Sequence, residues 1–455
     1  MQRRIALALF GLWLCLPALG QQAPHRRGAQ ALALKPPMGW NSWDSFATSI
    51  DEAQVRAEAL FMARHLRGYG WRYVVIDEGW YASGPQEGEA GRERLHLDAL
   101  GRYVPDPDRF PSAVGGAGLR PLAAYVHSLG LRFGIHILRG IPRQAVANNL
   151  PIANSPYRAA QAADPNDTCP WNDFNYGIKA ASAAGRAYYR SLARLYARWG
   201  VDFVKADCIA SHPYKGGEIR ILSQALRNAG RPMVLSLSPG PAPLAEAHEL
   251  SANAEMWRIS NDVWDLWRTG AGFPQGVANQ FARAAAWERY AGPGHWPDAD
   301  MLPLGPLRPR PGWGRPRASR LSAEEARTMF TAWCMFRSPL MMGGNLLLAD
   351  PSTLALLTNA EVIAVDQDST GNRNVPVPDA AVTIWTARPA RGGGHYIAAF
   401  NLSDQPQHVA YAWSALGLPA RRYRVRDLWQ HRWAGASGRF DTTLAPHASV
   451  IDLVR

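Results

Sequence analysis

The chain has 455 residues, which is enough for one large domain followed by a smaller one. Its formal charge of +12 could attract acidic polymers, but only four of the 49 basic residues are lysines, and the arginines are scattered along the chain. No basic run alternates with aromatic residues, so the sequence argues against a function in nucleic-acid binding.

Residues 1–20 have the order of a secretory signal peptide: two arginines, an apolar core and a small-residue end. The core is too short to span a bilayer. Cys15 follows Leu14, whereas lipidation requires a small residue at that position. No later stretch resembles a transmembrane helix. We therefore expect cleavage near Gly20 and a secreted or periplasmic protein without a membrane span.

The next part of the chain has the pattern of a parallel α/β domain. Short apolar segments are followed by amphipathic helical stretches, an order that is typical of parallel sheets. The segments lie at 38–43, 73–76, 132–137, 203–206 and 233–237. The helical stretches at 52–66 and 183–199 carry apolar residues at helical spacing.

Polar residues stand at the ends of these apolar segments. They are Asp77 and Glu78, His136, Lys205 and Asp207, and Ser236 and Ser238. A barrel places its active site at the carboxyl ends of its strands, whereas a doubly wound sheet gathers ligand groups at one switch point. Since nearly every segment ends in such a residue, we expect a (β/α)8 TIM barrel over 31–371.

From residue 372 the helical periodicity stops. Short alternating segments follow at 382–385, 396–400, 423–425 and 450–453, with turn residues between them. This pattern predicts a C-terminal antiparallel β-domain over 372–455, built as a β-sandwich.

Three cysteines follow the predicted signal peptide. Cys334 lies in an apolar run, so we expect a buried thiol. An oxidising compartment would permit a disulfide between Cys169 and Cys208. Three cysteines without close pairing or histidine spacing argue against a zinc site.

Asp207 is the first candidate for catalysis. It closes an apolar segment, and Lys205 lies two residues earlier on the same face. A nearby ammonium favours an ionised carboxylate, as a nucleophile requires. A structural ion pair at a barrel rim explains this pattern equally well, so the local sequence leaves both interpretations open.

Asp262 is the second candidate, framed by tryptophans and by Arg258 four residues earlier. Apolar neighbours favour the neutral carboxyl group that a general acid needs. Asp265 competes with it, although its position after Asn261 is also typical of a helix start. Because Asp262 follows a strand end more closely, we prefer Asp262.

Residues 292–301 are too rich in Gly, Pro and Asp for an ordinary helix or strand, so we expect a loop that directs carboxylates toward a pocket. Asp298 and Asp300 could instead hold a cation. The longer ligand pattern of calcium loops is missing, which argues against a metal site.

Acidic residues also stand beside large aromatic ones, as in Trp43 with Asp44 and in Trp80 with Asp77 and Glu78. Sugars need this pairing, because an aromatic face covers the C–H side of the ring while carboxylates accept hydrogen bonds from hydroxyl groups. A single tryptophan is more often part of a core, but several acidic, tryptophan-rich strand ends favour a sugar site.

In order and spacing, segments over nearly the whole chain resemble glycoside hydrolase family 27, the α-galactosidase and α-N-acetylgalactosaminidase family. They lie at 37–43, 76–80, 134–136, 205–207, 257–262, 292–301 and 360–368. The resemblance implies a retaining exo-glycosidase that needs no cofactor and no metal. Its substrates would be oligosaccharides or polysaccharide side chains with terminal galactose-like sugars.

The resemblance also implies roles for individual residues. Asp207 would be the nucleophile and Asp262 the acid/base, and two carboxyl groups about 5 Å apart would suit this retaining route. The terminal sugar would be held by Trp43, Asp77, Glu78, His136, Lys205, Ser238, Arg258 and Asp300.

Three of these residues depart from the usual α-galactosidase pattern. Glu78 replaces an aspartate that holds the C4 and C6 hydroxyls, and its extra methylene suits a sugar without the C6 hydroxymethyl group, such as β-L-arabinopyranose. Ser238 resembles the small residue of the N-acetylgalactosaminidase branch and would admit a bulkier C2 substituent. His136 stands where a tyrosine is common and adds a titratable group.

α-Galactosidase is therefore the leading hypothesis, with β-L-arabinopyranosidase and α-N-acetylgalactosaminidase as alternatives in the same family. A carbohydrate-binding protein that has lost catalysis is an alternative from another class, but both expected carboxylates are present. An endo-acting enzyme is a further alternative, although a crowded acidic pocket favours chain ends. The sequence leaves the oligomeric state open.

Overall fold

A computed structural model describes residues 32–83, 94–308 and 315–455. The predicted signal peptide lies outside these residues. Leu32–Arg455 form one compact unit. Within the described ranges, no helix is both long and apolar enough to cross a membrane.

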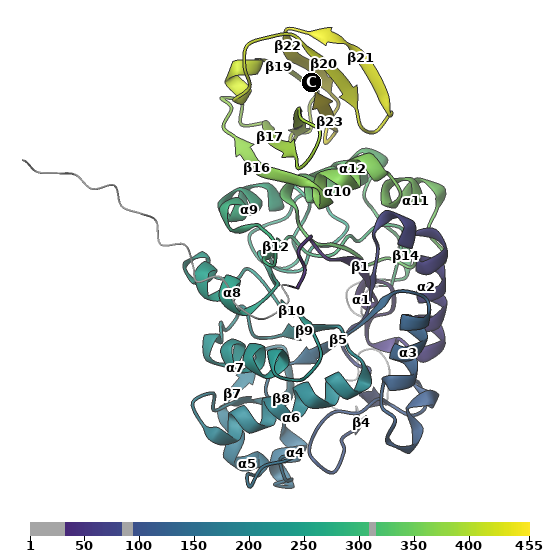
Figure 1. The fold of residues 1–455 in the computed structure, drawn as a ribbon, viewed down its shortest axis with the longest axis vertical. Coiled ribbons are helices and arrows are strands. Elements are labelled where there is room, and N and C mark those ends of the chain that lie inside the picture. Colours follow the sequence, from purple (N-terminus) through teal and green to yellow (C-terminus); the bar gives the residue numbers. More distant parts are fainter. Residues whose placement is uncertain (1–31, 84–93, 309–314) are drawn as a thin grey trace, which may run out of the picture. The chain divides into compact units, whose positions relative to one another are not determined.

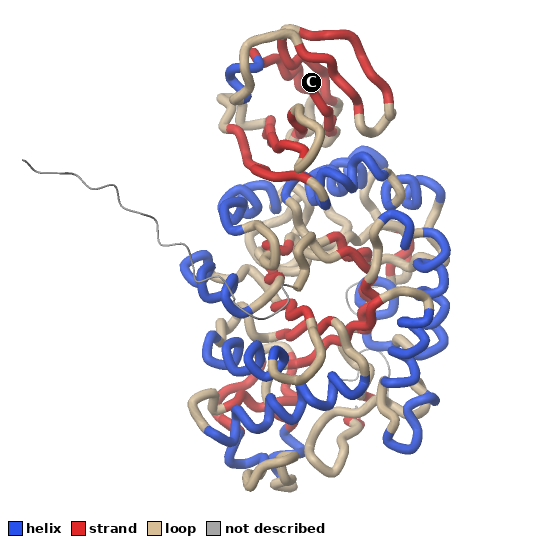
Figure 2. Tube along the Cα trace, viewed as in Figure 1, coloured by secondary structure: helices blue, strands red, loops and turns tan. Residues whose placement is uncertain are grey.

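Eight parallel strands form one sheet in the order β12-β11-β10-β9-β5-β2-β1-β15. They are β1 (Met38–Asn41), β2 (Tyr73–Ile76), β5 (Arg132–Leu138), β9 (Phe203–Asp207), β10 (Val234–Leu237), β11 (Met256–Arg258), β12 (Trp296–Asp298) and β15 (Leu340–Met342). A parallel bridge between Leu302 and Met342 brings the two edges together. Helices surround these strands (Figure 2), which confirms the predicted (β/α)8 barrel.

The helices around the barrel follow the strands in the chain. They are α1 (Trp43–Phe46), α2 (Glu52–His65), α3 (Arg120–Ser128), α6 (Ala183–Trp199), α7 (Gly216–Arg227), α8 (Ala247–Asn253), α9 (Gln280–Trp287), α10 (Ala323–Phe336), α11 (Pro351–Leu357) and α12 (Ala360–Gln367). Asp51 and Gln54 form a capping box that starts α2. Ser182 caps the start of α6, and Gly200 ends it in a left-handed conformation. Both helices predicted from periodicity are present.

The five strands predicted from apolar segments are present to within two residues, but the expectation for 292–301 is wrong in part, because Trp296–Asp298 is barrel strand β12. The Trp296 N–H donates to Glu255 before β11, so the nitrogen of Pro297 faces the opposite side. On that side β12 has no continuous partner. A proline is tolerated there because no ladder hydrogen bond is lost.

Between β5 and α6 the chain leaves the barrel and forms a small antiparallel sheet. Its strands are β6 (Ile141–Pro142), β7 (Ala163–Cys169) and β8 (Asn172–Ile178). The helices α4 (Arg143–Ala147) and α5 (Ala159–Ala162) lie between β6 and β7 in the chain. A two-residue turn at 170–171 joins β7 to β8. We call β7, this turn and β8 the hairpin. Shorter strand pairs are β3 (Ala82–Ser83) with β4 (Arg94–Leu95), and β13 (Pro306–Leu307) with β14 (Arg317–Ala318).

The C-terminal part is built mainly of β-strands, as predicted (Figure 1), with one short 3-10 helix at Trp413–Leu416. A six-stranded antiparallel sheet contains β16 (Ser369–Val375), β17 (Val382–Pro389), β18 (His395–Asn401), β23 (Ser449–Val454), β20 (Tyr423–Asp427) and β21 (Arg432–Ser437). A second sheet pairs β19 (Gln407–Ala412) with β22 (Arg439–Leu444). Ile384 and Ile397 of the first sheet pack in one core with Val409 and Phe440 of the second, which confirms a sandwich.

Candidate active site

Charged side chains gather at the carboxyl ends of the barrel strands. Asp77 follows β2, His136 lies on β5, and Lys205 and Asp207 lie on β9. Arg258 ends β11 and Asp298 ends β12. A parallel barrel brings strand ends together at one edge, so residues distant in sequence meet there.

Asp77 is the best-supported carboxylate of this cluster. Its Oδ2 accepts hydrogen bonds from Lys205 Nζ at 2.8 Å and from Asn41 Nδ2 at 2.7 Å. Its backbone N–H donates to the hydroxyl of Ser42. Burial would raise the pKa of Asp77, but the Lys205 ammonium and the charge of His136 hold it well below its usual range. Asp77 is therefore a fixed anion.

Asp207 is paired with a histidine. His136 Nε2 lies 3.2 Å from Asp207 Oδ2, and the Cys208 N–H donates to Asp207 Oδ1 at 2.6 Å. Burial would raise the pKa of Asp207, yet these bonds and the nearby Lys205 hold it below its ordinary value. The structure thus favours an ionised Asp207 whose side chain is 20% exposed.

The predicted ion pair of Lys205 with Asp207 is corrected in one respect. The hydrogen bond of Lys205 goes to Asp77, and the bond to Asp207 comes from His136. Lys205 acts on Asp207 through its charge alone. The reason is geometric, because β5, which carries His136, lies between β9 and β2. Local sequence contains no information on neighbouring strands.

Arg258 organises the opposite side of the cluster. Its guanidinium is buried and contacts Asp300 Oδ1 at 2.7 Å and Asp262 Oδ1 at 3.2 Å. Asp300 also accepts a hydrogen bond from the Val263 N–H at 2.7 Å. Burial would lower the pKa of Arg258, but the charges of Asp300, Asp262, Asp298 and Asp207 raise it. Both predicted catalytic carboxylates therefore lie in the field of one cation.

Asp300 and Asp262 differ in their surroundings. Asp300 is buried, and burial together with the negative charge of Asp262 raises its pKa to about 7 in spite of Arg258. The side chain of Asp262 is 35% exposed, so its apolar neighbours in the sequence do not close it off from solvent. Asp262 follows the short strand β11 and reaches the open end of the barrel, where solvent or a substrate can contact it.

Asp265 does not compete with Asp262 for a place in the site. It is buried, accepts a hydrogen bond from Arg317 Nε at 3.1 Å, and accepts another from the Arg320 N–H at 2.9 Å. It starts no helix, because the nearest following helix is α9. Its role in the fold is to hold β14 and the neighbouring Arg320.

Trp43 and Ser238 complete the predicted set. Trp43 is half-buried at the start of α1, and its N–H donates to Asn41 Oδ1. Ser238 lies one residue after β10, with its Oγ buried and without a hydrogen-bond partner among the described residues. Within the described ranges, the Ser238 hydroxyl forms no hydrogen bond to a side chain of the charged cluster.

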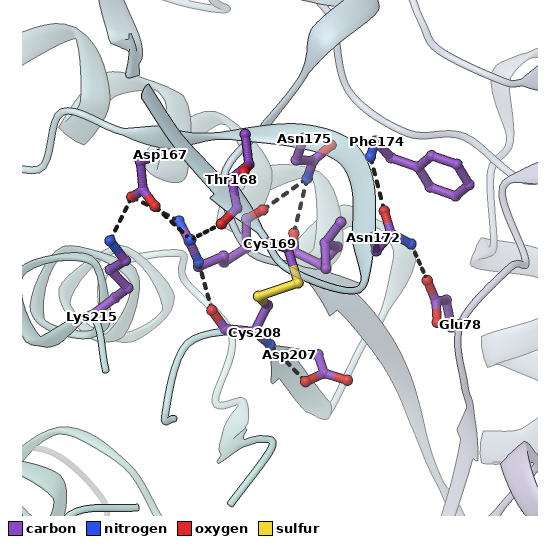
Figure 3. The surroundings of a disulfide bond; sticks show 12 residues. Glu78, Asp167, Thr168, Cys169, Asn172, Phe174, Asn175, Asp207, Cys208 and Lys215 are labelled. Carbon is purple, nitrogen blue, oxygen red and sulfur yellow. Dashed lines mark hydrogen bonds and ion pairs between the residues drawn. A yellow bond between two sulfur atoms is a disulfide. The ribbon is translucent and has the colours of Figure 1, made fainter. Parts of the chain in front are cut away.

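Glu78 connects the cluster to the hairpin, as Figure 3 shows. Asn172 Nδ2 donates a hydrogen bond to Glu78 Oε1 at 2.6 Å. Three residues earlier, Cys169 forms a disulfide with Cys208, the residue after Asp207. The possible disulfide is thus present, and Cys334 is the buried free thiol that was expected.

Two buried carboxylates of the cluster are paired with cations of the protein. Among the described residues, no group of three or more His, Cys, Asp and Glu side chains is arranged to hold a metal ion. Asp77 is engaged by Lys205 and Asp300 by Arg258. Carboxylates fixed in this way can accept hydrogen bonds from the hydroxyl groups of a sugar.

Comparison with known proteins gives the family. A sequence profile described as Alpha galactosidase A matches residues 35–146 and 174–368. A second profile, for the α-galactosidase C-terminal β-sandwich domain, matches 379–451. The chain belongs to glycoside hydrolase family 27. It is a glycosidase of that family, which confirms the resemblance inferred from the ordered motifs.

Relatives within glycoside hydrolase family 27 differ in substrate. A β-L-arabinopyranosidase from Geobacillus stearothermophilus is 44% identical, with a TM-score of 0.88 over 93% of this chain and 96% of its own. Alpha-galactosidase A of Cellvibrio japonicus is 27% identical over 89% of this chain and 85% of its own. The α-N-acetylgalactosaminidase of Gallus gallus is 27% identical over 88% and 87%.

Sequence reasoning missed two residues of the site, Asn41 and Asn172. Asp44 was noted as an acidic residue beside Trp43, but its burial was not foreseen. Asp44 is buried with one carboxylate oxygen unpartnered among the described residues, and burial followed by the charge of Asp300 raises its pKa well above the usual value. Asn172 had no sequence signal except its distance of three residues from Cys169.

Proposed function

We propose that this family 27 glycosidase is a retaining exo-β-L-arabinopyranosidase. The observation that carries the proposal is Glu78 at the strand end beside Asp77. β-L-Arabinopyranose has the ring of α-D-galactose without the hydroxymethyl group on C5. The longer side chain of Glu78 occupies space that this group would need, and the 44% identity to a β-L-arabinopyranosidase supports the same choice.

In the proposed reaction, Asp207 attacks the anomeric carbon of the terminal sugar and forms a covalent glycosyl ester. Its lowered pKa keeps it ionised at neutral pH. Asp262 protonates the departing glycosidic oxygen and then removes a proton from the water that cleaves the ester. The exposure of Asp262 gives the leaving group and the water a path to it.

The remaining residues would orient the sugar. Asp77 is a fixed anion whose Oδ2 is engaged by Lys205 and Asn41. Its Oδ1 accepts the Glu78 N–H at 2.9 Å and can accept a sugar hydroxyl with its second lone pair. Arg258 holds Asp300 and Asp262 in one arrangement. Trp43 offers an aromatic face at the end of β1. The substrates would be oligosaccharides or polysaccharide side chains that end in L-arabinopyranose.

α-Galactosidase, which led the sequence hypotheses, is the second candidate. It is favoured by the curated relative from Cellvibrio japonicus and by the presence of the whole charged cluster. The hydroxyl of Ser238 is buried and has no hydrogen-bond partner among the described residues. This small side chain is the reason to test an N-acetyl-α-D-galactosaminide as well.

We further propose that the enzyme acts outside the cytoplasm, secreted or in the periplasm. The disulfide between Cys169 and Cys208 supports this proposal, because such bonds persist in oxidising compartments. Fractionation of cells that express the full chain, with detection by a C-terminal epitope, tests it. Retention of all the protein in the cytoplasmic fraction would contradict it.

The substrate is tested with 4-nitrophenyl β-L-arabinopyranoside, α-D-galactoside and N-acetyl-α-D-galactosaminide. We expect the highest kcat/KM on the arabinopyranoside, and retention of configuration in the first product seen by proton NMR. Glu78→Asp should shift the preference toward the galactoside by about tenfold, since one methylene in a pocket is worth 10–200-fold.

Asp207→Asn serves as the inactive control. A higher kcat/KM on the galactoside than on the arabinopyranoside in the unmodified enzyme would contradict the proposed substrate. Release of no aryl group from any of the three glycosides would instead favour a carbohydrate-binding protein that has lost catalysis.

A further inference from the structure

The hairpin lies partly outside the family profile and reaches the sugar-binding residues. The profile matches 35–146 and 174–368, so residues 147–173 are not matched. They include all of β7, the turn and Asn172 at the start of β8. Yet Asn172 contacts Glu78, the residue that carries the proposed substrate preference.

The amide of Asn172 has a defined orientation. Its Oδ1 accepts a hydrogen bond from the Phe174 N–H at 2.9 Å. The acceptor end of the amide is thereby occupied, and the Nδ2 group faces Glu78, to which it donates at 2.6 Å. Figure 3 shows both bonds, with Asn172 between Phe174 and Glu78. A donor is therefore aimed at the carboxylate by the backbone of the hairpin itself.

The hairpin is also firmly attached to the barrel. The disulfide joins Cys169 to Cys208 after β9. Arg139 holds Asp167 of β7 through two hydrogen bonds, at 3.0 and 2.8 Å. Lys215 contacts the same carboxylate at 2.9 Å. These links lie within five residues of Asn172, so its donor is held in place before any substrate binds.

Glu78 needs such support more than an aspartate would. A glutamate has one more rotatable bond than an aspartate, and each additional rotamer moves its carboxylate to a different place. A side chain that selects a sugar by filling space beside C5 must occupy one rotamer. An external hydrogen bond at Oε1 provides that constraint.

We propose that Asn172 is a positioning residue for substrate preference, because it fixes the rotamer of Glu78 and so excludes the hydroxymethyl group on C5. This inference rests on the proposed function. It assigns part of the specificity to a segment that the family profile does not match.

The test compares kcat/KM on the aryl β-L-arabinopyranoside and the aryl α-D-galactoside for the full chain. Asn172→Ala should lower the preference for the arabinopyranoside by about tenfold, equivalent to about 1.4 kcal/mol. Asn172→Asp, which keeps the shape and loses the donor, should do the same. Asn166→Ala changes an exposed asparagine on the same hairpin and should leave the preference unchanged.

A double-mutant cycle separates positioning from a general structural role. In the Glu78→Asp background the shorter carboxylate is out of reach of Asn172, so adding Asn172→Ala should not change the preference further. A structural role would lower both kcat/KM values and the melting temperature equally in both backgrounds.

The measurements distinguish failure of the proposed function from failure of the role proposed for Asn172. If the unmodified enzyme prefers the galactoside, the proposed function is overturned and the inference with it. If the enzyme prefers the arabinopyranoside and Asn172→Ala leaves that preference within twofold, or shifts it equally in the Glu78→Asp background, the inference alone is overturned.

Discussion

Nε2 of His136 lies 3.2 Å from Oδ2 of Asp207, and the imidazole is buried between that carboxylate and the charge of Asp77. Burial would lower the pKa of His136, but Asp77 and Asp207 raise it above its ordinary value. A tyrosine at this position would supply a hydrogen bond without a positive charge. The histidine thus places beside the proposed nucleophile a group that is protonated more readily than a free imidazole.

This pairing predicts the acid side of the pH profile. In His136→Gln the charge is lost while a donor is kept, so the pKa of Asp207 should rise toward its ordinary value. The acid limb of kcat/KM should move to higher pH by about one unit. His65→Gln, on the exposed end of α2, is the control. An acid limb that stays in place would show that His136 does not set the ionisation of Asp207.

The Lys205–Asp77 pair predicts a large effect on stability. In Lys205→Met the buried carboxylate of Asp77 loses its counter-charge, which should lower the free energy of unfolding by about 3–5 kcal/mol in urea denaturation. Lys205→Met with Asp77→Asn should recover part of that loss, because the uncompensated charge is then gone. A double variant no more stable than Lys205→Met would contradict this explanation.

The same pair gives a pH dependence with a definite sign. The pKa of Asp77 is lower in the folded than in the unfolded chain. Its contribution to stability is therefore present above the ordinary aspartate pKa of about 4 and is lost as the pH falls through the folded value. The drop in unfolding free energy between pH 4 and pH 2 should be smaller in Asp77→Asn than in the unmodified enzyme.

Glu58 predicts the opposite dependence at a position away from the site. It is buried on α2, accepts the Leu346 N–H at 3.0 Å, and burial raises its pKa to about 8. The folded state therefore holds this proton up to about pH 8, and stability falls as the pH rises from the unfolded pKa of about 4.3. Glu58→Gln should remove that loss, a gain of about 4 kcal/mol at pH 7.

The check is urea denaturation at pH 5, 6, 7 and 8. The difference between Glu58→Gln and the unmodified enzyme should grow with pH, and kcat/KM should not change. A difference that is constant over this range would rule out the titration of Glu58 as its cause.

The disulfide predicts a loss of stability on reduction. Cys169 and Cys208 are 39 residues apart, and a cross-link of that span contributes about 2–4 kcal/mol. Treatment with dithiothreitol should lower the unfolding free energy by this amount. The variant Cys169→Ala with Cys208→Ala should already be destabilised and should not respond to the reductant. A response of that variant would point to another target.

The barrel was largely predictable because its strands and helices leave local patterns. The segments that became β2, β5, β9 and β10 are short and largely apolar, and each ends in or is followed by a polar residue. β12 was missed because a strand of three residues is too short to show an alternation of apolar and polar residues. Its proline is also a residue that is typical of turns. The hairpin carries no apolar alternation, with polar residues along most of β7.

The candidate site was predictable as a set of residues but not as a set of contacts. Asp207, Arg258 and Asp300 could be named from strand ends and motifs. The partners of Asp207 and Asp77 depend on which strands are neighbours, and the exposure of Asp262 depends on how far β11 extends. Local sequence contains neither the order of the strands nor the length of β11. These contacts could therefore be described only from the structure.

The hairpin leaves the barrel after β5 and returns to it before α6, and none of its residues belongs to the eight parallel strands. Its turn could therefore be exchanged for another sequence while the proposed nucleophile and acid keep their places. Protein engineering could use this separation. A library restricted to residues 170–175 would search for new sugar preferences without touching the groups proposed to break the glycosidic bond.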